Sequence, residues 1–331
     1  MTSSIRNTIQ CSVEESLSVS ENGWIVRHEN NPIISPKDIA TGATCVFNSG
    51  FVQVGEETVG LINVWDLQWV PRFFIGRSKD GVHFDIGTRN MAVPPKEYPY
   101  VPHEGIFDTR ITPIDGTYYI TYNVASRLGG RIMLARTKDF SSLETLGFIT
   151  GPDHRNCTLF PQKIGNYYAR LERPMGEGGI GDIYISYSPD LMFWGKTKLV
   201  LEKNHRYWSS EKIGAGAPPV RTEEGWLVIY HACRKSMNGI VYNMGCMLLD
   251  LENPSVIRGI MNDCLMTPEF SYERVGMVSN VIFPTAALRR EGSDELNIYY
   301  GAADTCIGLV RANVNVLVER CIKDGVSAIH K

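Results

Sequence analysis

Several common classes of protein are excluded by what the 331-residue chain lacks. No stretch approaches the roughly eighteen apolar residues of a membrane-spanning helix, and the first fifteen residues, MTSSIRNTIQCSVEE, lack the apolar core of a signal peptide. Lysine and arginine form no cluster, and 33 basic against 36 acidic residues give a net charge of −3. The charge pattern that attracts nucleic acid or an anionic membrane is therefore missing. These absences predict a cytoplasmic protein that binds a small ligand, with neither nucleic acid nor membrane as partner.

Cysteine is present, but not in the arrangements that bind metals. The eight cysteines are widely scattered, with no CxxC pair and no Cys/His cluster at the spacing of zinc ligands. We expect buried free thiols, no metal and no cofactor.

Helical periodicity is also scarce, whereas short aromatic and β-branched runs separated by glycine, aspartate and asparagine extend from about residue 43 to 310. One module recurs, a turn followed by an aromatic strand, at residues 114–123, 163–172, 222–231 and 293–302. Strands that end in a turn containing aspartate recur as well. Their aspartates, spaced 59, 51 and 60 residues apart, are Asp80, Asp139, Asp190 and Asp250.

A repeat of this length across the whole chain predicts an all-β fold, a five-bladed β-propeller with four-stranded blades. A parallel β-helix would need a shorter and more regular period, and a sandwich would show no such recurrence. We expect a single domain over residues 1–331. Its terminal extensions, 1–25 and 312–331, have compositions compatible with helix.

Polar residues that interrupt apolar strands are candidates for the central channel of such a propeller. The basic and donor residues among them are Arg155, Asn156, Arg173, Lys212, His231 and Tyr242. Together they suit an anion with two negative charges, for which phosphate is the natural candidate. For any one basic residue, a salt bridge with a carboxylate such as Glu172 or Glu211 is the simpler interpretation. Their position at strand ends of different blades favours the anion site.

Two carboxylates and several aromatic residues extend this candidate site. Asp108 is the candidate proton donor, and Asp304 is either an acceptor for sugar hydroxyls or a turn residue. Rings such as Phe107 and Phe283 can stack on the apolar face of a sugar, although core packing is the alternative for each ring alone.

The motifs EGIFDTRI, RNCTLFPQKI, EKIGAGAPP, WLVIYH, SNVIFP and YYGAADT, in this order, resemble those of glycoside hydrolase family 130. The resemblance covers most of the chain and implies a five-bladed propeller that is a mannoside phosphorylase. It places the general acid at Asp108 and the phosphate site at the six basic and donor residues named above. The sugar-binding positions that it implies, with their neighbours, are Asn48, Ser49, Asn63, Asp66, Phe107, Phe283 and Asp304.

The family reaction is inverting. Phosphate attacks the anomeric carbon of a terminal β-mannoside and releases α-mannose 1-phosphate, while the acid acts through a mannose hydroxyl. A hydrolase needs a second carboxylate to activate water, whereas a phosphorylase needs cations that hold an already charged nucleophile, and this chain offers the cations.

We therefore expect a glycosyltransferase-type enzyme, a reversible mannosyl phosphorylase that acts on a β-mannoside oligosaccharide with phosphate or mannose 1-phosphate as co-substrate. Linkages of the β-1,2 type are favoured. The resemblance leaves GDP-mannose open as a donor, and the sequence leaves a homo-oligomer open. The alternatives are a phosphorylase of β-1,4-mannosyl-glucose or mannooligosaccharides, a β-mannosidase that uses water, and a non-catalytic carbohydrate-binding propeller.

One segment departs from the family pattern. Where many members have an arginine followed by acidic residues, resembling FRxDD, this chain reads INVWDLQWVPR, with Asn63 at the arginine and Trp65 at one acidic position. Asp66 alone is kept. Because this segment touches the sugar in relatives, we expect a remodelled mannose or acceptor subsite, and the extra aromatic ring suits a longer carbohydrate acceptor.

Overall fold

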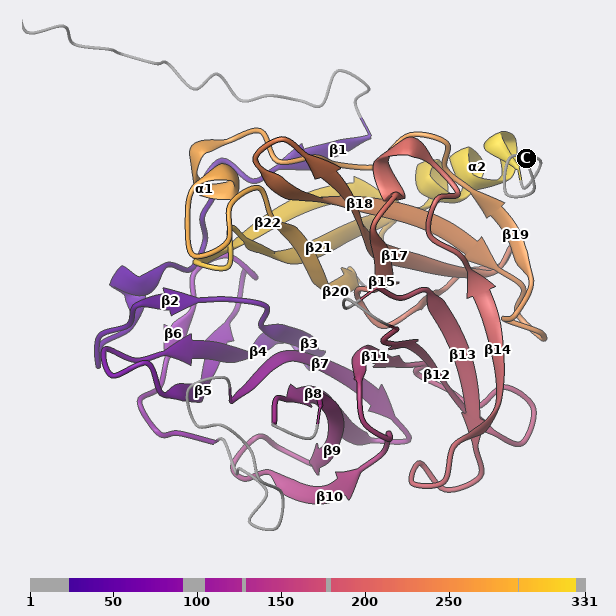
Figure 1. Ribbon diagram of the computed structural model, residues 1–331. Helices are drawn as coiled ribbons and strands as arrows, with labels where there is room; N and C mark the ends of the chain where they lie inside the picture. Colours follow the sequence, from indigo (N-terminus) through magenta and orange to yellow (C-terminus); the bar gives the residue numbers. More distant parts are fainter. Residues whose placement is uncertain (1–23, 92–104, 127–128, 177–179, 291, 326–331) are drawn as a thin grey trace, which may run out of the picture.

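The computed structural model describes residues 24–91, 105–126, 129–176, 180–290 and 292–325. These residues form five antiparallel sheets arranged as the blades of a propeller, which confirms the predicted fold. The inner strands β3, β7, β11, β15 and β20 gather around the centre of the molecule (Figure 1). No helix within the described ranges has the length and apolarity needed to cross a membrane.

The strands follow one another blade by blade along the chain. The first blade contains β2 (Cys45–Val46), β3 (Gly50–Val54), β4 (Glu57–Trp65), β5 (Pro71–Ser78) and β6 (Asp85–Ile86). The second contains β7 (Ile106–Ile114), β8 (Thr117–Val124), β9 (Arg131–Thr137) and β10 (Glu144–Phe148). The third contains β11 (His154–Leu159), β12 (Tyr168–Pro174), β13 (Ile183–Ser188) and β14 (Gly195–Leu201).

The fourth blade contains β15 (Lys212–Ala215), β16 (Val220–Arg221), β17 (Trp226–Ser236), β18 (Gly239–Leu249) and β19 (Ile257–Ile260). The fifth contains β20 (Ile282–Arg289), β21 (Glu295–Ala302), β22 (Cys306–Asn313) and, as its outer strand, β1 (Ile25–Arg27). The helical elements are η1 (Pro36–Asp38), η3 (Tyr207–Ser209), α1 (Ser271–Arg274) and α2 (Val314–Asp324).

Strand β1 closes the propeller by pairing with β22, although the two lie at opposite ends of the chain. Buried Arg27, at the end of β1, donates to the Glu273 carboxylate at 2.7 Å, and Glu273 is fully buried. The fifth blade is therefore held together by both ends of the chain. The sequence predicts an N-terminal extension over residues 1–25. Residues 1–23 of it lie outside the described part of the chain, and Ile25 already belongs to β1.

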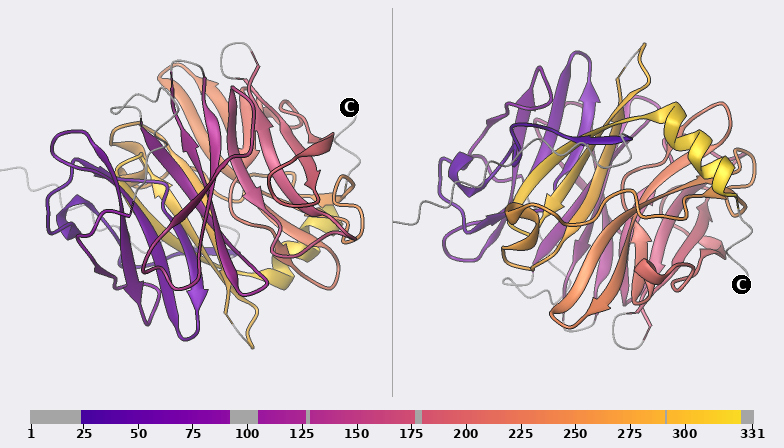
Figure 2. Two further views of the ribbon diagram at one scale, coloured as in Figure 1. Left: turned by 90° about the horizontal axis from the view of Figure 1, so that it is seen from below. Right: turned by 90° about the horizontal axis from the view of Figure 1, so that it is seen from above.

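The C-terminal extension is helical from Val314, as its composition allowed. Helix α2 lies along the outside of the fourth and fifth blades (Figure 2). Its buried residues join the hydrophobic cluster between these two blades, so the helix is part of the packed domain.

The period-two alternation of the strands builds the core between blades. In β4, Val59 and Leu61 pack with apolar residues of the second blade, whereas Ile62 and Val64 point the other way, towards the fifth. Strand β4 is thus apolar on both of its faces and contributes to the cores on both sides of the first blade.

The repeat of aspartates marks one position in each blade. Asp80, Asp139, Asp190 and Asp250 each follow the strand that is third in its sheet when counted from the centre of the propeller. A carboxylate oxygen of each accepts a hydrogen bond from a backbone N–H two residues ahead. In the fifth blade, Asn313 ends the third strand and caps α2 instead. The repeat therefore reflects the architecture and not the active site.

Candidate active site

Three inner strands are interrupted at the same level of the central channel. Asn48, Asp108 and Asn156 lie at these interruptions and have positive φ angles of 41°, 58° and 55°. The ladders of β7 and β11 shift register around Asp108 and Asn156, and Asn48 lies in the gap between β2 and β3. Asparagine and aspartate tolerate this conformation better than most residues. Each interruption brings one polar side chain into the lining of the pocket.

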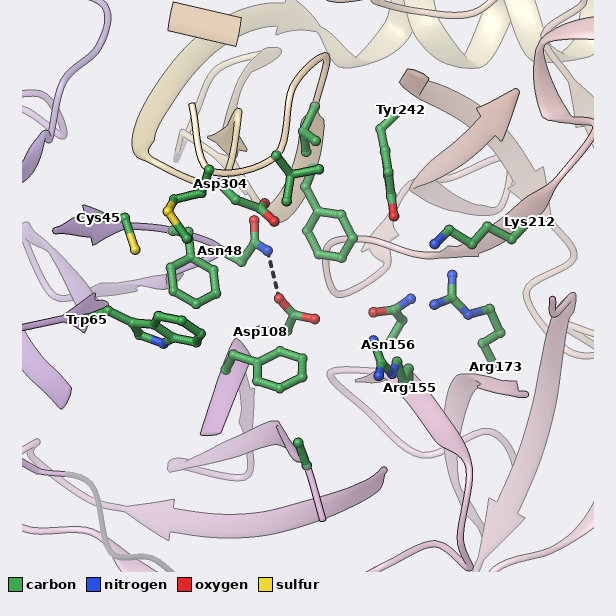
Figure 3. A pocket seen from close by; sticks show the side chains of 17 residues that line it. Cys45, Asn48, Trp65, Asp108, Arg155, Asn156, Arg173, Lys212, Tyr242 and Asp304 are labelled. Atoms are coloured by element: carbon green, nitrogen blue, oxygen red, sulfur yellow. Dashed lines mark hydrogen bonds between the residues drawn. The ribbon is translucent and has the colours of Figure 1, made fainter. Parts of the chain in front are cut away.

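These side chains line a pocket of about 350 Å³ in which charges are separated in space (Figure 3). Arg155, Arg173 and Lys212 lie on one side, and Asp108 lies in the middle. Trp65 lies on the side opposite the cations. The pocket can therefore bind an anion on the cation side of Asp108 and an uncharged group on the Trp65 side.

Two amides fix the Asp108 carboxylate. Asn48 Nδ2 donates to one oxygen at 2.7 Å (Figure 3), and Asn123 Nδ2 donates to the other at 2.6 Å. Asp108 is 8% exposed, so little water competes for these bonds. Each oxygen keeps a further lone pair, so the carboxylate can still exchange a proton with a ligand hydroxyl.

Asp304 lies in the turn between β21 and β22, with a positive φ of 48°. Removal from water raises its pKa to about 7, and the nearby Asp108 carboxylate contributes in the same direction. Near neutral pH, Asp304 can therefore donate to a hydroxyl when protonated or accept from one when ionised. Asp304 is thus a turn residue that also lines the pocket, and its role as an acceptor for sugar hydroxyls stays a prediction.

The three cations have no acidic partner within the described residues, where none of them lies within 4.0 Å of a carboxylate oxygen. Burial lowers the pKa of Lys212, and the positive charges of Arg173 and Arg155 lower it further. The Lys212 ammonium lies 5.0 Å from the centre of the Tyr242 ring. Such a cluster favours binding of an anion, because a negative charge offsets the repulsion among the three cations.

Arg173 is positioned by residues beneath it. With its oxygen facing Arg173, the Asn156 amide accepts from both terminal guanidinium nitrogens at 3.0 Å. Arg173 also donates to Nε2 of His231 at 3.1 Å. Burial lowers the pKa of His231 well below its ordinary value, as do the positive charges of Arg173, Arg110 and Lys212. His231 is therefore a neutral acceptor that orients Arg173.

Most of the residues proposed from the sequence meet in this pocket. Those that line it are Asn48, Phe107, Asp108, Arg155, Asn156, Arg173, Lys212, Tyr242, Phe283 and Asp304. Arg155 and Arg173 are direct register partners in β11 and β12. The hairpin of β11 and β12 thus brings them together, and β11, which begins at His154, includes both Arg155 and Asn156.

Four proposed residues lie outside the pocket lining. His231 lies beneath Arg173, and Ser49 accepts a hydrogen bond from the backbone N–H of Asn63 at 2.9 Å. The Asn63 side chain is fully buried. Asp66 accepts from the backbone of its own turn and from Arg72 at 3.1 Å. The segment that departs from the family pattern therefore reaches the pocket through Trp65.

Sequence reasoning missed several residues of the site. Asn123 holds Asp108 from β8 and could have been noticed as an amide within an aromatic strand. The apolar residues of the lining that were missed are Cys45, Phe47, Ala125, Met277, Val278 and Val281. Their sequence carries no polar signal, because apolar side chains are expected equally in the core. Within the described residues no group of three or more histidine, cysteine, aspartate or glutamate side chains is placed to hold a metal ion.

A family model described as β-1,4-mannooligosaccharide phosphorylase matches residues 20–323. A β-1,4-mannooligosaccharide phosphorylase of Ruminococcus albus is 35% identical over 303 residues, covering 89% of this chain and 90% of the relative. A β-1,2-mannobiose phosphorylase of Listeria innocua is 37% identical over 232 residues, covering 70% of this chain and 63% of the relative. Both sequences therefore align with the chain through most of its propeller.

Solved structures agree with the sequence comparison. The Listeria innocua β-1,2-mannobiose phosphorylase in complex with β-1,2-mannobiose superposes with a TM-score of 0.81 at 28% identity. The superposition covers 90% of this chain and 99% of that chain. The whole propeller is thus shared with an enzyme whose disaccharide complex is known.

Proposed function

The chain belongs to glycoside hydrolase family 130, and from this premise we propose that it is an inverting phosphorylase of β-mannosides. Phosphate attacks the anomeric carbon of the terminal mannosyl group, the bond from that carbon to the acceptor oxygen breaks, and a proton passes to that oxygen. The products are α-mannose 1-phosphate and the shortened acceptor. The reverse reaction transfers mannose to an acceptor and releases phosphate.

The observation that supports this proposal is the cluster of uncompensated cations facing Asp108 across one pocket. Arg155, Arg173 and Lys212 hold the phosphate, and their charges offset its negative charge during the attack. Asp108 supplies the proton in phosphorolysis through a mannose hydroxyl and takes it back in synthesis. Asn48 and Asn123 keep the carboxylate oriented in both directions.

A β-1,2-linked substrate is favoured over a β-1,4-linked one. The structural match to the Listeria innocua β-1,2-mannobiose phosphorylase extends over 99% of that chain. A 1,2-β-oligomannan phosphorylase of Thermoanaerobacter is also 33% identical over 245 residues. The β-1,4 linkage is the alternative to test, because the Ruminococcus albus relative is named for it. None of these relatives is named for GDP-mannose, and the proposal rests on phosphate.

The direct test is incubation with α-mannose 1-phosphate and either mannose or β-1,2-mannobiose, with release of phosphate as the measurement. Phosphorolysis of β-1,2-mannobiose and of β-1,4-mannobiose, with α-mannose 1-phosphate as the measured product, decides the linkage. No phosphate release with any mannose-based or glucose-based acceptor would count against the proposal. Complete turnover of a β-mannoside without added phosphate would show a hydrolase instead, and binding without turnover would show a non-catalytic propeller.

A further inference from the structure

The lining of the pocket becomes more exposed from its base to its mouth. Asn48, Asp108 and Arg173 are 5%, 8% and 3% exposed, whereas Met277 and Val278 are 45% and 43% exposed. A mannosyl group bound beside Asp108 is therefore enclosed by protein. The acceptor joined to it has to leave the pocket past the exposed part of the lining, which includes Met277 and Val278.

The backbone holds these two residues in place at the mouth. The Met277 N–H donates to Oγ1 of Thr305 at 2.8 Å, and the Val278 N–H donates to the Ala303 carbonyl at 3.2 Å. The Ala303 N–H in turn donates to the Val281 carbonyl at 3.0 Å. This segment is thus fastened to the turn that carries Asp304, and its apolar side chains have a defined position over the pocket.

Met277 and Val278 themselves offer a ligand no free hydrogen-bond donor. The side chains of Met277 and Val278 have no polar hydrogen, and both of their backbone N–H groups are already engaged. A sugar face rich in hydroxyls would lose water here without gaining a donor in return. An apolar group would gain by leaving water.

On the basis of the proposed function, we propose that Met277 and Val278 form an apolar acceptor subsite that selects mannosides carrying an alkyl or aryl aglycone. The acceptor hydroxyl faces Asp108, and the aglycone packs on the two side chains. Specificity at this position then comes from burial of apolar surface and not from hydrogen bonds.

The experiment compares methyl and hexyl β-mannoside as acceptors, with α-mannose 1-phosphate as donor and phosphate release as readout. We expect the hexyl compound to have a KM about tenfold lower, because burial of about two methylene groups corresponds to a tenfold change in affinity. Equal KM values for the two acceptors would overturn the proposal.

Substitutions of similar size test whether Met277 and Val278 cause the preference for the hexyl compound. The double variant Met277→Gln, Val278→Thr introduces polar atoms, and we expect its hexyl-to-methyl preference to fall to about one. Val275→Thr is the matched control, because Val275 is 74% exposed in the same segment but does not line the pocket. A double variant that keeps the native preference, or a control that loses it, would contradict the assignment.

Direct binding separates this subsite from the catalytic proposal. If no phosphate is released with any acceptor, the proposed function fails. Calorimetric titration with methyl and hexyl β-mannoside still tests whether Met277 and Val278 bind the aglycone. Tighter binding of the hexyl compound by the native protein than by the double variant supports the subsite, and equal binding overturns it. A further outcome would also contradict the subsite: no preference for the hexyl compound, together with a native dimer that the double variant does not form. Met277 and Val278 would then belong to an interface between two copies of the chain.

Discussion

Replacement of Lys212 by methionine tests the phosphate site, because it removes one cation and keeps an unbranched side chain. A unit charge pair about 4 Å apart contributes about 4 kcal/mol at an effective dielectric constant of 20. A hydrogen bond to a charged group contributes about 1.5 to 3 kcal/mol. Lys212 is half-buried and Arg173 remains in the variant, so we expect a loss of about 2 kcal/mol, or roughly 30-fold in the KM for phosphate.

The assay for Lys212→Met is phosphorolysis of β-1,2-mannobiose at varied phosphate concentration, with α-mannose 1-phosphate as the measured product. The KM for mannobiose should change little, because the sugar lies beside Asp108. Lys235→Met is the matched control, since Lys235 is exposed in the same blade and does not line the pocket. A phosphate KM within twofold of the native value, or an equal rise in both KM values, would refute the assignment of Lys212 to phosphate.

Three further changes test other parts of the molecule. Asp108→Asn should lower kcat by about 10² to 10⁴-fold, the range for a lost general acid, and an unchanged kcat would remove Asp108 from the mechanism. The pKa of Asp304 is about 7 when folded and about 3.9 when unfolded, so the native protein loses stability as the pH rises from 4 to 7. Thermal melts should therefore show the Tm of Asp304→Asn rising relative to the native Tm over this range, and a constant difference would contradict the raised pKa. Arg27→Met leaves Glu273 buried without its ion-pair partner and should cost about 3 to 5 kcal/mol in urea unfolding, whereas a loss below 1 kcal/mol would mean that closure by β1 does not depend on this pair.

The fold was predictable because its repeat is local. The turn with aspartate after the third strand depends on hydrogen bonds within a few residues, so the sequence shows it directly. The pairing of β1 with β22 was not predictable in this way, since Arg27 and Glu273 are 246 positions apart and neither belongs to the repeat. Closure depends on contacts between the ends of the chain, which leave no periodic signal.

The polar part of the site was predictable for a related reason. Asn48, Asp108 and Asn156 interrupt apolar strands, and in the structure all three have positive φ, Asp108 and Asn156 at shifts of register and Asn48 between two strands. The apolar part was not predictable, because Met277 and Val278 lie in a segment whose place depends on hydrogen bonds to a distant turn. Their assignment to the acceptor subsite depends on their exposure at the mouth of the pocket, which is known only from the folded structure.

The simplest objection to an anion site was that Glu172 neutralises its neighbour Arg173. Strand geometry decides this question, because successive residues of β12 point to opposite faces of the sheet. Glu172 accordingly pairs with Arg170 at 2.6 Å, two positions away on its own face, while Arg173 points into the pocket. The charge of Arg173 is thus left for a ligand by the alternation of the strand itself. A carboxylate next to a cation in a β-strand sequence is therefore poor evidence that the two form a salt bridge.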